Sequence, residues 1–234
     1  MNAHRSLMLA VLFALAPFVA KPVAADPILD FTGGTAEQAP SDATVGWKFT
    51  VTGSAITITG LGLFDAGADG LAQSHQIGLW TGTGSVLASA TINAGNSTTA
   101  VQSTSPDGNW RSTSDMMNAT NTPITSLQLN PGDYVVGAFY AKGSPDSVMF
   151  GATTSTIKGV TWDEYRGASG PASFPGTFTF EGGGKGFFGP NLFTATTTTA
   201  TTTPPIPEPT SLILLGSGLA GLAGRIAWRK RRPK

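Results

Sequence analysis

The densest group of polar side chains in the sequence consists of Asp65, Asp69, Ser74 and His75, in a glycine-containing segment between two predicted strands. Carboxylate oxygens and backbone carbonyls of such a loop are suitable ligands for a hard cation. Asp65 and Asp69 are therefore candidate calcium ligands, although their spacing is not that of an EF-hand. The alternative is structural, with Asp side chains accepting hydrogen bonds from local backbone amides and His75 orienting the turn.

Groups that could catalyse a reaction are scarce. The sequence has no cysteine, and His75 is the only histidine after residue 25. No serine lies in a G-x-S-x-G elbow, and the glycine-rich segment 182–186 lacks the spacing of a phosphate-binding loop. Asp163, Glu164 and Glu181 could supply the carboxylate pair of a glycosidase, but such residues are more often solvated strand edges. We therefore expect no enzymatic activity, with a carbohydrate-active enzyme as the alternative.

Three aromatic residues in polar surroundings are candidates for binding carbohydrate. Trp110 lies between Asn109 and Arg111, whereas Trp162 and Tyr165 flank two acidic residues. Flat aromatic faces beside hydrogen-bonding loops suit a sugar ring, which makes a calcium-stabilised carbohydrate-binding module a further possible function. The alternative is that each ring caps one end of the hydrophobic core.

The elements that must position these residues are predicted to be β-strands. Apolar and polar residues alternate over 45–52, which indicates a strand with one buried face. Turn-forming pairs such as Asp69-Gly70 and Pro131-Gly132 separate further candidates. The roughly ten predicted strands favour an all-β fold, an antiparallel β-sandwich with Greek-key or jelly-roll-like connections. Besides 45–52, the strand candidates are 56–59, 61–64, 76–80, 86–92, 124–129, 133–141, 147–150, 159–165, 177–180 and 187–193.

Composition excludes several classes of protein. The 234 residues can form one medium domain, and only 12% of them are charged, against roughly 25% in soluble domains. All fourteen acidic residues lie within 26–209 beside six basic ones, a net charge of −8. This acidic body argues against a nucleic-acid partner, because phosphate binding requires a basic face. Without cysteine there is no disulfide framework and no thiolate metal site.

The N-terminal segment has the pattern of a secretory signal peptide. Arg5 precedes an apolar run from Leu7 to Ala20, and Val23-Ala24-Ala25 supplies small residues before Asp26. We therefore predict a signal peptide helix over residues 1–25 and a mature chain that begins near Asp26. Export across the inner membrane follows from this prediction.

The C-terminal segment has three parts. The tripeptide Pro207, Glu208 and Pro209 precedes an apolar stretch, and the chain then ends in the basic run 229–234. The stretch 210–224 has 15 uncharged residues, fewer than the roughly 20 of a comfortable transmembrane helix, so it is extended toward Trp228. By the positive-inside rule the basic end stays in the cytoplasm. The segment predicts a marginal membrane anchor.

This tripartite segment resembles the PEP-CTERM sorting signal, which occurs in Gram-negative bacteria that make extracellular polysaccharide. The resemblance covers residues 207–234 and implies recognition by an exosortase-type membrane protease at the Pro-Glu-Pro motif. Processing would then release a transiently membrane-anchored protein to the cell surface or outside the cell, where polysaccharide is a possible partner.

The predicted organisation has four parts. A signal peptide (1–25) precedes a β-sandwich domain (26–193), a Thr/Pro-rich linker (194–206) and the sorting signal with its transmembrane helix (207–234). The linker would extend the body away from the membrane. The body resembles an exported bacterial β-domain of unknown function, through segments such as 45–51, 69–80 and 131–138. We expect a structural, adhesive or matrix role for it.

Overall fold

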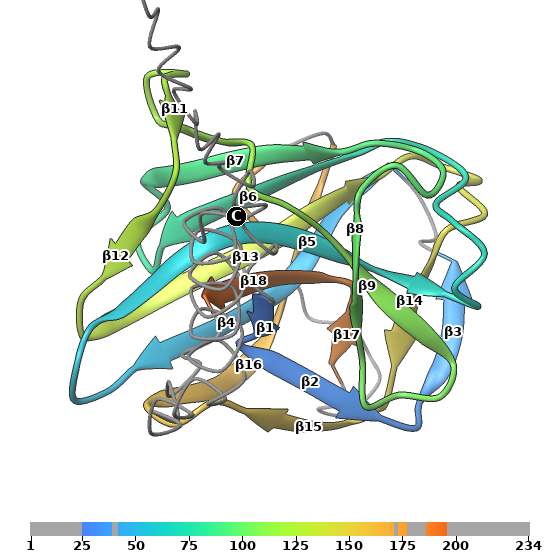
Figure 1. The fold of residues 1–234 in the computed structure, drawn as a ribbon, viewed down its shortest axis with the longest axis horizontal. Helices are drawn as coiled ribbons and strands as arrows, with labels where there is room; N and C mark the ends of the chain where they lie inside the picture. The colour runs from blue at the N-terminus through green and yellow to red at the C-terminus, as the bar shows by residue number, and fades with distance from the viewer. Residues whose placement is uncertain (1–24, 39–41, 171–172, 177–185, 196–234) are drawn as a thin grey trace, which may run out of the picture. The chain divides into compact units, whose positions relative to one another are not determined.

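The computed structural model describes residues 25–38, 42–170, 173–176 and 186–195 (Figure 1). Every regular element in these ranges is a β-strand, and all the strand pairs are antiparallel. The all-β, antiparallel prediction is therefore confirmed for the described part of the chain. The predicted signal peptide helix and the transmembrane helix lie outside it. Within the described ranges, no helix has the length and apolar character needed to cross a membrane.

The first sheet contains both ends of the described domain. Strand β18 pairs with β1 on one side and β5 on the other, so that Ala25 lies opposite Ala195. The six strands, in sheet order and with β12 paired separately to β5, are β1 (Ala25–Pro27), β18 (Pro190–Ala195), β5 (Ile56–Ala66), β9 (Gly108–Thr113), β8 (Thr99–Gln102) and β12 (Leu127–Leu129). The domain thus extends to Ala195, two residues into the predicted linker.

The second sheet has seven strands, and two smaller sheets complete the described fold. In sheet order the seven strands are β11 (Pro123–Ile124), β10 (Met116–Asn118), β7 (Val86–Ile92), β6 (His75–Thr81), β13 (Gly132–Tyr140), β4 (Ala43–Val51) and β16 (Val160–Ser169). The smaller sheets are β17 (Phe187–Phe188), β14 (Ser147–Phe150) and β3 (Thr35–Gln38), and β15 (Thr153–Thr156) with β2 (Leu29–Thr32).

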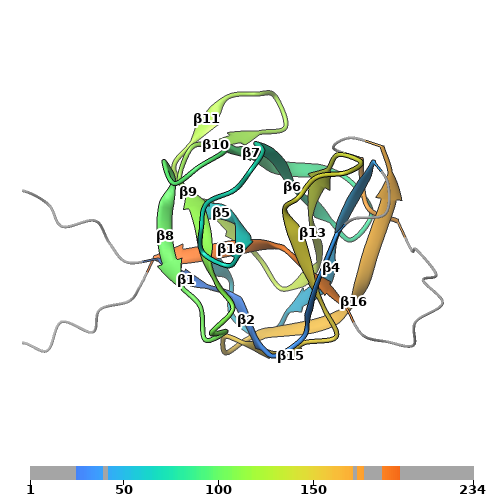
Figure 2. The same cartoon turned by 90° about the vertical axis from the view of Figure 1, so that its right-hand side faces the viewer.

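The hydrophobic core lies between the two larger sheets, which face each other in the view of Figure 2. On β4 the alternating residues Val45, Trp47, Phe49 and Val51 are all buried, as the sequence pattern predicts. The Trp47 indole nitrogen donates a hydrogen bond of 2.8 Å to the carbonyl oxygen of Pro190 on β18, which ties the sheets together. The arrangement is consistent with the predicted sandwich, and its Greek-key or jelly-roll connections stay a prediction.

Several predicted strand boundaries differ from the structure. β7 and β14 have the predicted bounds, but 56–59 and 61–64 form one strand, and 124–129 is divided between β11 and β12. The glycines of β5 do not mark a turn there. A Cβ added at Gly62 would lie 2.4 Å from the ring of Phe193, so glycine at this position makes room for β18. The predicted strand 177–180 lies outside the described residues.

Candidate functional site

Asp65, the first candidate calcium ligand, is one half of a buried ion pair. Its side chain is 2% exposed near the end of β5, and Arg111 extends to it from the neighbouring strand β9. Arg111 donates from Nε and Nη2 to Asp65 Oδ2 over 2.7 and 2.6 Å, and the Gly70 amide donates to the same oxygen over 3.0 Å. The guanidinium therefore balances the charge of Asp65, and the Gly70 contact fixes the loop that follows.

Asp69, the second candidate, is exposed in that loop. The loop turns sharply, because Gly67, Ala68 and Gly70 all have positive φ angles. Among the residues that the structure describes, no group of three or more His, Asp and Glu side chains could hold a metal ion. A calcium ion at Asp65 would have to compete with Arg111, so calcium binding at Asp65 and Asp69 stays a prediction that the geometry does not favour.

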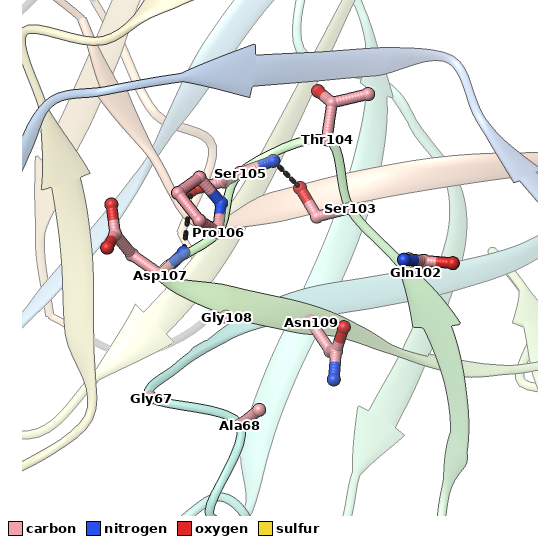
Figure 3. Close-up of a pocket in the computed structure, with 10 residues that line it drawn as sticks. All are labelled: Gly67, Ala68, Gln102, Ser103, Thr104, Ser105, Pro106, Asp107, Gly108 and Asn109. Carbon is pink, nitrogen blue, oxygen red and sulfur yellow. Dashed lines mark hydrogen bonds between the residues drawn. The ribbon is translucent and has the colours of Figure 1, made fainter.

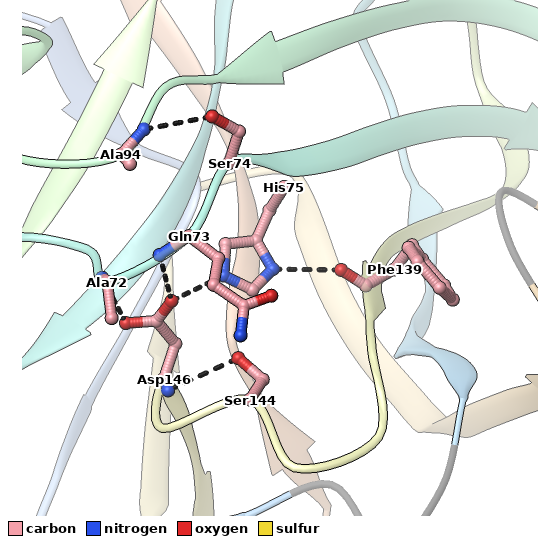
Figure 4. A network of polar contacts seen from close by, with 8 residues as sticks. All are labelled: Ala72, Gln73, Ser74, His75, Ala94, Phe139, Ser144 and Asp146. Carbon is pink, nitrogen blue, oxygen red and sulfur yellow. Dashed lines mark hydrogen bonds and ion pairs between the residues drawn. The ribbon is translucent and has the colours of Figure 1, made fainter.

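His75, at the start of β6, contacts β13 through one ring nitrogen and the β13–β14 loop through the other (Figure 4). Its side chain is 1% exposed, with Nδ1 2.8 Å from the Phe139 carbonyl oxygen and Nε2 2.8 Å from Asp146 Oδ2. The Asp146 carboxylate also accepts hydrogen bonds from the amides of Ala72 and Gln73. His75 and Asp146 together hold two loops that are distant in sequence.

The geometry of this network indicates a structural role for His75. A carbonyl oxygen only accepts hydrogen bonds, so Nδ1 of His75 carries a hydrogen, and Nε2 is occupied by Asp146. Neither ring nitrogen faces a serine hydroxyl that it could activate. The two serines in Figure 4 accept backbone hydrogen bonds instead, Ser144 from the Asp146 amide and Ser74 from the Ala94 amide. The arrangement matches the structural interpretation of His75, in which the imidazole orients the turn.

Trp110, the first aromatic candidate, lies in the core rather than in a polar loop. It is completely buried on β9, where its ring packs edge-on against Phe31 and Phe64. The indole nitrogen donates to Asp30 Oδ1 over 3.2 Å. Because both faces of the ring are covered, Trp110 offers no platform for a sugar.

Trp162 and Tyr165 are half-buried on the second sheet, at its edge strand β16. The Trp162 ring packs against Phe188 and the Tyr165 ring against Phe187, with centroids 5.9 and 5.0 Å apart. Burial raises the pKa of Tyr165 to about 12. Both rings therefore cap this end of the core, the alternative that the sequence left open. Their ligand-binding role stays a prediction.

The acidic residues beside them are engaged in polar contacts. Asp163 lies at a β-bulge, where Thr50 donates to it over 2.8 Å, and Glu164 is paired with Arg166. Lys48 contacts Asp133 over 2.9 Å and Asp163 over 3.7 Å. The hydrogen bond with Lys48 lowers the pKa of Asp133, and the same bond raises the pKa of Lys48. Glu181 lies outside the described residues.

A polar pocket of about 520 Å³ lies at the β8–β9 turn, beside the Asp65 loop (Figure 3). Its serine side chains serve the turn itself. Ser103 Oγ accepts from the Ser105 amide and donates to Asp30, and Ser105 Oγ accepts from the Asp107 amide. No aromatic side chain lines the described part of this pocket. The hydroxyl groups at this pocket therefore stabilise the turn that forms it.

Sequence reasoning missed three residues that organise these regions: Arg111, Asp146 and Asp30. Each is an isolated charged residue whose main partners are far away in the sequence, as Arg111 is 46 residues from Asp65 and Asp146 is 71 from His75. The residues around Arg111 are polar apart from Trp110, so the sequence alone gives no sign that a charge is buried there.

Comparison with known proteins assigns the C-terminal segment. Residues 205–232 match the family model of the PEP-CTERM protein-sorting motif. The chain carries this sorting motif. The motif includes Pro207, Glu208 and Pro209, which lie outside the described residues. It implies export to the cell surface or the exterior through exosortase, a membrane protease. Comparisons with curated proteins and with solved structures gave no match.

Proposed function

We propose that this protein is an exported, surface-sorted β-domain protein without catalytic activity, with a structural, adhesive or matrix role. The observation that carries the proposal is the PEP-CTERM sorting motif at residues 205–232, which follows an antiparallel β-domain. An exosortase-type protease is its partner during sorting. The body is transiently anchored through the C-terminal helix and is then released by processing.

The two ends of the described domain lie next to each other, which suits a body that has a membrane segment at each end. Ala25 pairs with Ala195, and Asp26 with Thr194, so the chain enters and leaves the domain at adjacent points of one sheet. A signal peptide before Ala25 and a sorting segment after Ala195 would therefore start side by side.

The polar geometry supports a non-catalytic role. His75 has both ring nitrogens occupied, and Asp163 and Glu164 are each held by a neighbouring donor. A glycosidase requires two carboxyl groups that face each other across an open cleft. Asp163 and Glu164 serve contacts within the sheet instead, which favours a structural body over the carbohydrate-active enzyme.

The sorting part of the proposal can be tested in a bacterium that has an exosortase. Full-length chains with Glu208→Ala and with Glu37→Ala, a matched change on the exposed strand β3, are compared with the parent by cell fractionation. The parent and Glu37→Ala should reach the surface or the medium, whereas Glu208→Ala should accumulate as precursor in the inner membrane. Equal distributions of all three chains would contradict the proposal.

A further inference from the structure

A hollow of about 630 Å³ lies on the outer face of the seven-stranded sheet, over β6, β7 and β10. Paired residues of antiparallel strands point to the same side of a sheet. Ser89 pairs with Gly78 on β6 and with Met117 on β10, so these three residues form one row across the hollow. Their neighbours Ile77 and Ala90 belong to the core. We call this site the β6–β7 hollow, and its strands lie together in Figure 2.

A buried aromatic side chain, Trp80 with 4% exposure, and an exposed apolar one, Val86, border the hollow. The Trp80 ring lies over Gly78, because a Cβ added there would be 2.2 Å from Cη2 of the ring. Phe174 packs edge-on against the same indole, with centroids 6.1 Å apart, which holds the ring in place. Val86, 43% exposed, is the one large hydrophobic side chain in the described residues that is exposed, and it lines the same hollow.

Uncommitted polar side chains complete the lining. Six polar residues line the hollow: Gln76, Ser89, Thr91, Asn93, Asp115 and Asn121. None of their side chains makes a hydrogen bond or an ion pair with the described residues. The three amides each offer two donor hydrogens and an acceptor oxygen, and a vicinal diol can satisfy both kinds of group. In the pocket of Figure 3, by contrast, serine hydroxyls are used by the turn.

The turn that carries Asn121 is held by hydrogen bonds, and the charge of the lining favours an uncharged ligand over an anionic one. Asn121 has a left-handed backbone, with φ of 57°, in a turn held by the Asn118 side chain, which accepts from the amides of Thr120 and Thr122. The described lining has a single carboxylate, Asp115, and no Lys, Arg or His. An anionic ligand would meet repulsion without a compensating cation. A neutral, hydroxyl-rich ligand matches this chemistry.

We propose that the β6–β7 hollow binds an uncharged oligosaccharide. The amides and hydroxyls would hydrogen-bond the sugar hydroxyls, while Met117 and the exposed Val86 would contact its apolar C–H groups, and the buried Trp80 ring would support the site beneath them. The inference rests on the proposed function, since it names the chemical class that the body would bind in a matrix. It differs from the sequence prediction, which placed sugar binding at Trp110, Trp162 and Tyr165.

The test is affinity electrophoresis of the full-length chain in mild detergent. The gels contain dextran, hydroxyethylcellulose or galactomannan as neutral probes, and alginate as the anionic one. At least one neutral polysaccharide should retard the parent chain, and alginate should not. Gln76→Ala and Asn93→Ala should each weaken binding about three- to tenfold, the range expected for losing a neutral hydrogen bond. Both side chains are exposed, so the variants should keep the parent's melting temperature.

The matched control is Gln102→Ala, an exposed glutamine at the pocket of Figure 3, which should bind like the parent. The proposal is overturned if no neutral probe retards the parent, if alginate retards it as strongly, or if Gln102→Ala loses as much as the hollow variants. Binding by the purified chain does not depend on sorting. A failure here therefore leaves the Glu208 experiment unaffected, and a failure of sorting leaves this test intact.

Discussion

The buried pair of Asp65 and Arg111 allows a quantitative test of the fold. Both side chains are almost inaccessible, 2% and 6% exposed, and they are linked by two short hydrogen bonds. Removing one partner of such a pair leaves an uncompensated buried charge and typically costs about 3–5 kcal/mol. Among the described residues, Arg111→Met leaves the Gly70 amide, at 3.0 Å, as the one remaining hydrogen-bond donor to the Asp65 carboxylate. We therefore expect this variant to be at the upper end of that range.

The reciprocal change completes a double-mutant cycle. Asp65→Asn leaves the Arg111 guanidinium with the Ala68 carbonyl oxygen, a contact of 3.5 Å. The double variant contains no charge at the site, so it should be more stable than the sum of the single losses predicts. We expect a coupling free energy of about 2–3 kcal/mol, near the upper limit for residues in contact.

The assay is urea unfolding of residues 26–195, which contain all the described strands apart from the first residue of β1, followed by tryptophan fluorescence. The midpoint shifts at constant slope give the free-energy differences. Single variants that each cost less than about 1 kcal/mol, or costs that simply add, would refute the reasoning. Such a result would mean that water screens the pair in solution.

Three further predictions concern the burial of Tyr165, the pairing of Asp65 with Arg111, and the position of Ala25 in β1. Because burial raises the pKa of Tyr165 to about 12 from its ordinary 10.0, the phenol ionises more easily in the unfolded chain than in the folded one. The free energy of unfolding, measured by denaturant titration, should therefore fall as the pH rises from 10 to 12, and it should fall less steeply in Tyr165→Phe. Melting curves with calcium and with chelator should coincide, since Arg111 holds Asp65; a rise of several degrees with calcium, absent in Asp69→Asn, would restore the metal site. Signal peptidase should cut an unfolded precursor but not a prefolded one in vitro, because the bond after Ala25 lies inside β1; equal cutting of both would contradict that pairing.

The alternation of apolar residues predicted the strands that have one buried face. β4 and β7 follow this rule, and Trp47 and Phe49 are buried as expected. β14 has the predicted bounds without alternating, because the neighbours Val148 and Met149 are both buried. The β8–β9 hairpin was missed because Trp110 and Arg111, neighbours on opposite faces of β9, are both buried. Alternation cannot reveal a strand whose second face is covered through a buried charge.

The candidate site was predictable only where its contacts are local. The hydrogen bond between the Gly70 amide and Asp65, five residues apart, is of the kind expected for a structural loop. The partners of His75 and Arg111 come from distant strands and depend on the sheet topology. The β6–β7 hollow depends on register as well, because Gly78, Ser89 and Met117 align only after three strands have paired.

The most direct test of export and sorting is mass spectrometry of the protein released from the surface of an exosortase-positive cell. The released form should begin near Asp26 and should lack every peptide beyond the start of the C-terminal apolar stretch, at residue 210. The intact precursor, in the inner membrane, should retain the basic run 229–234. Recovering that run on the released protein would contradict processing at the sorting motif and with it the account of where this β-domain acts.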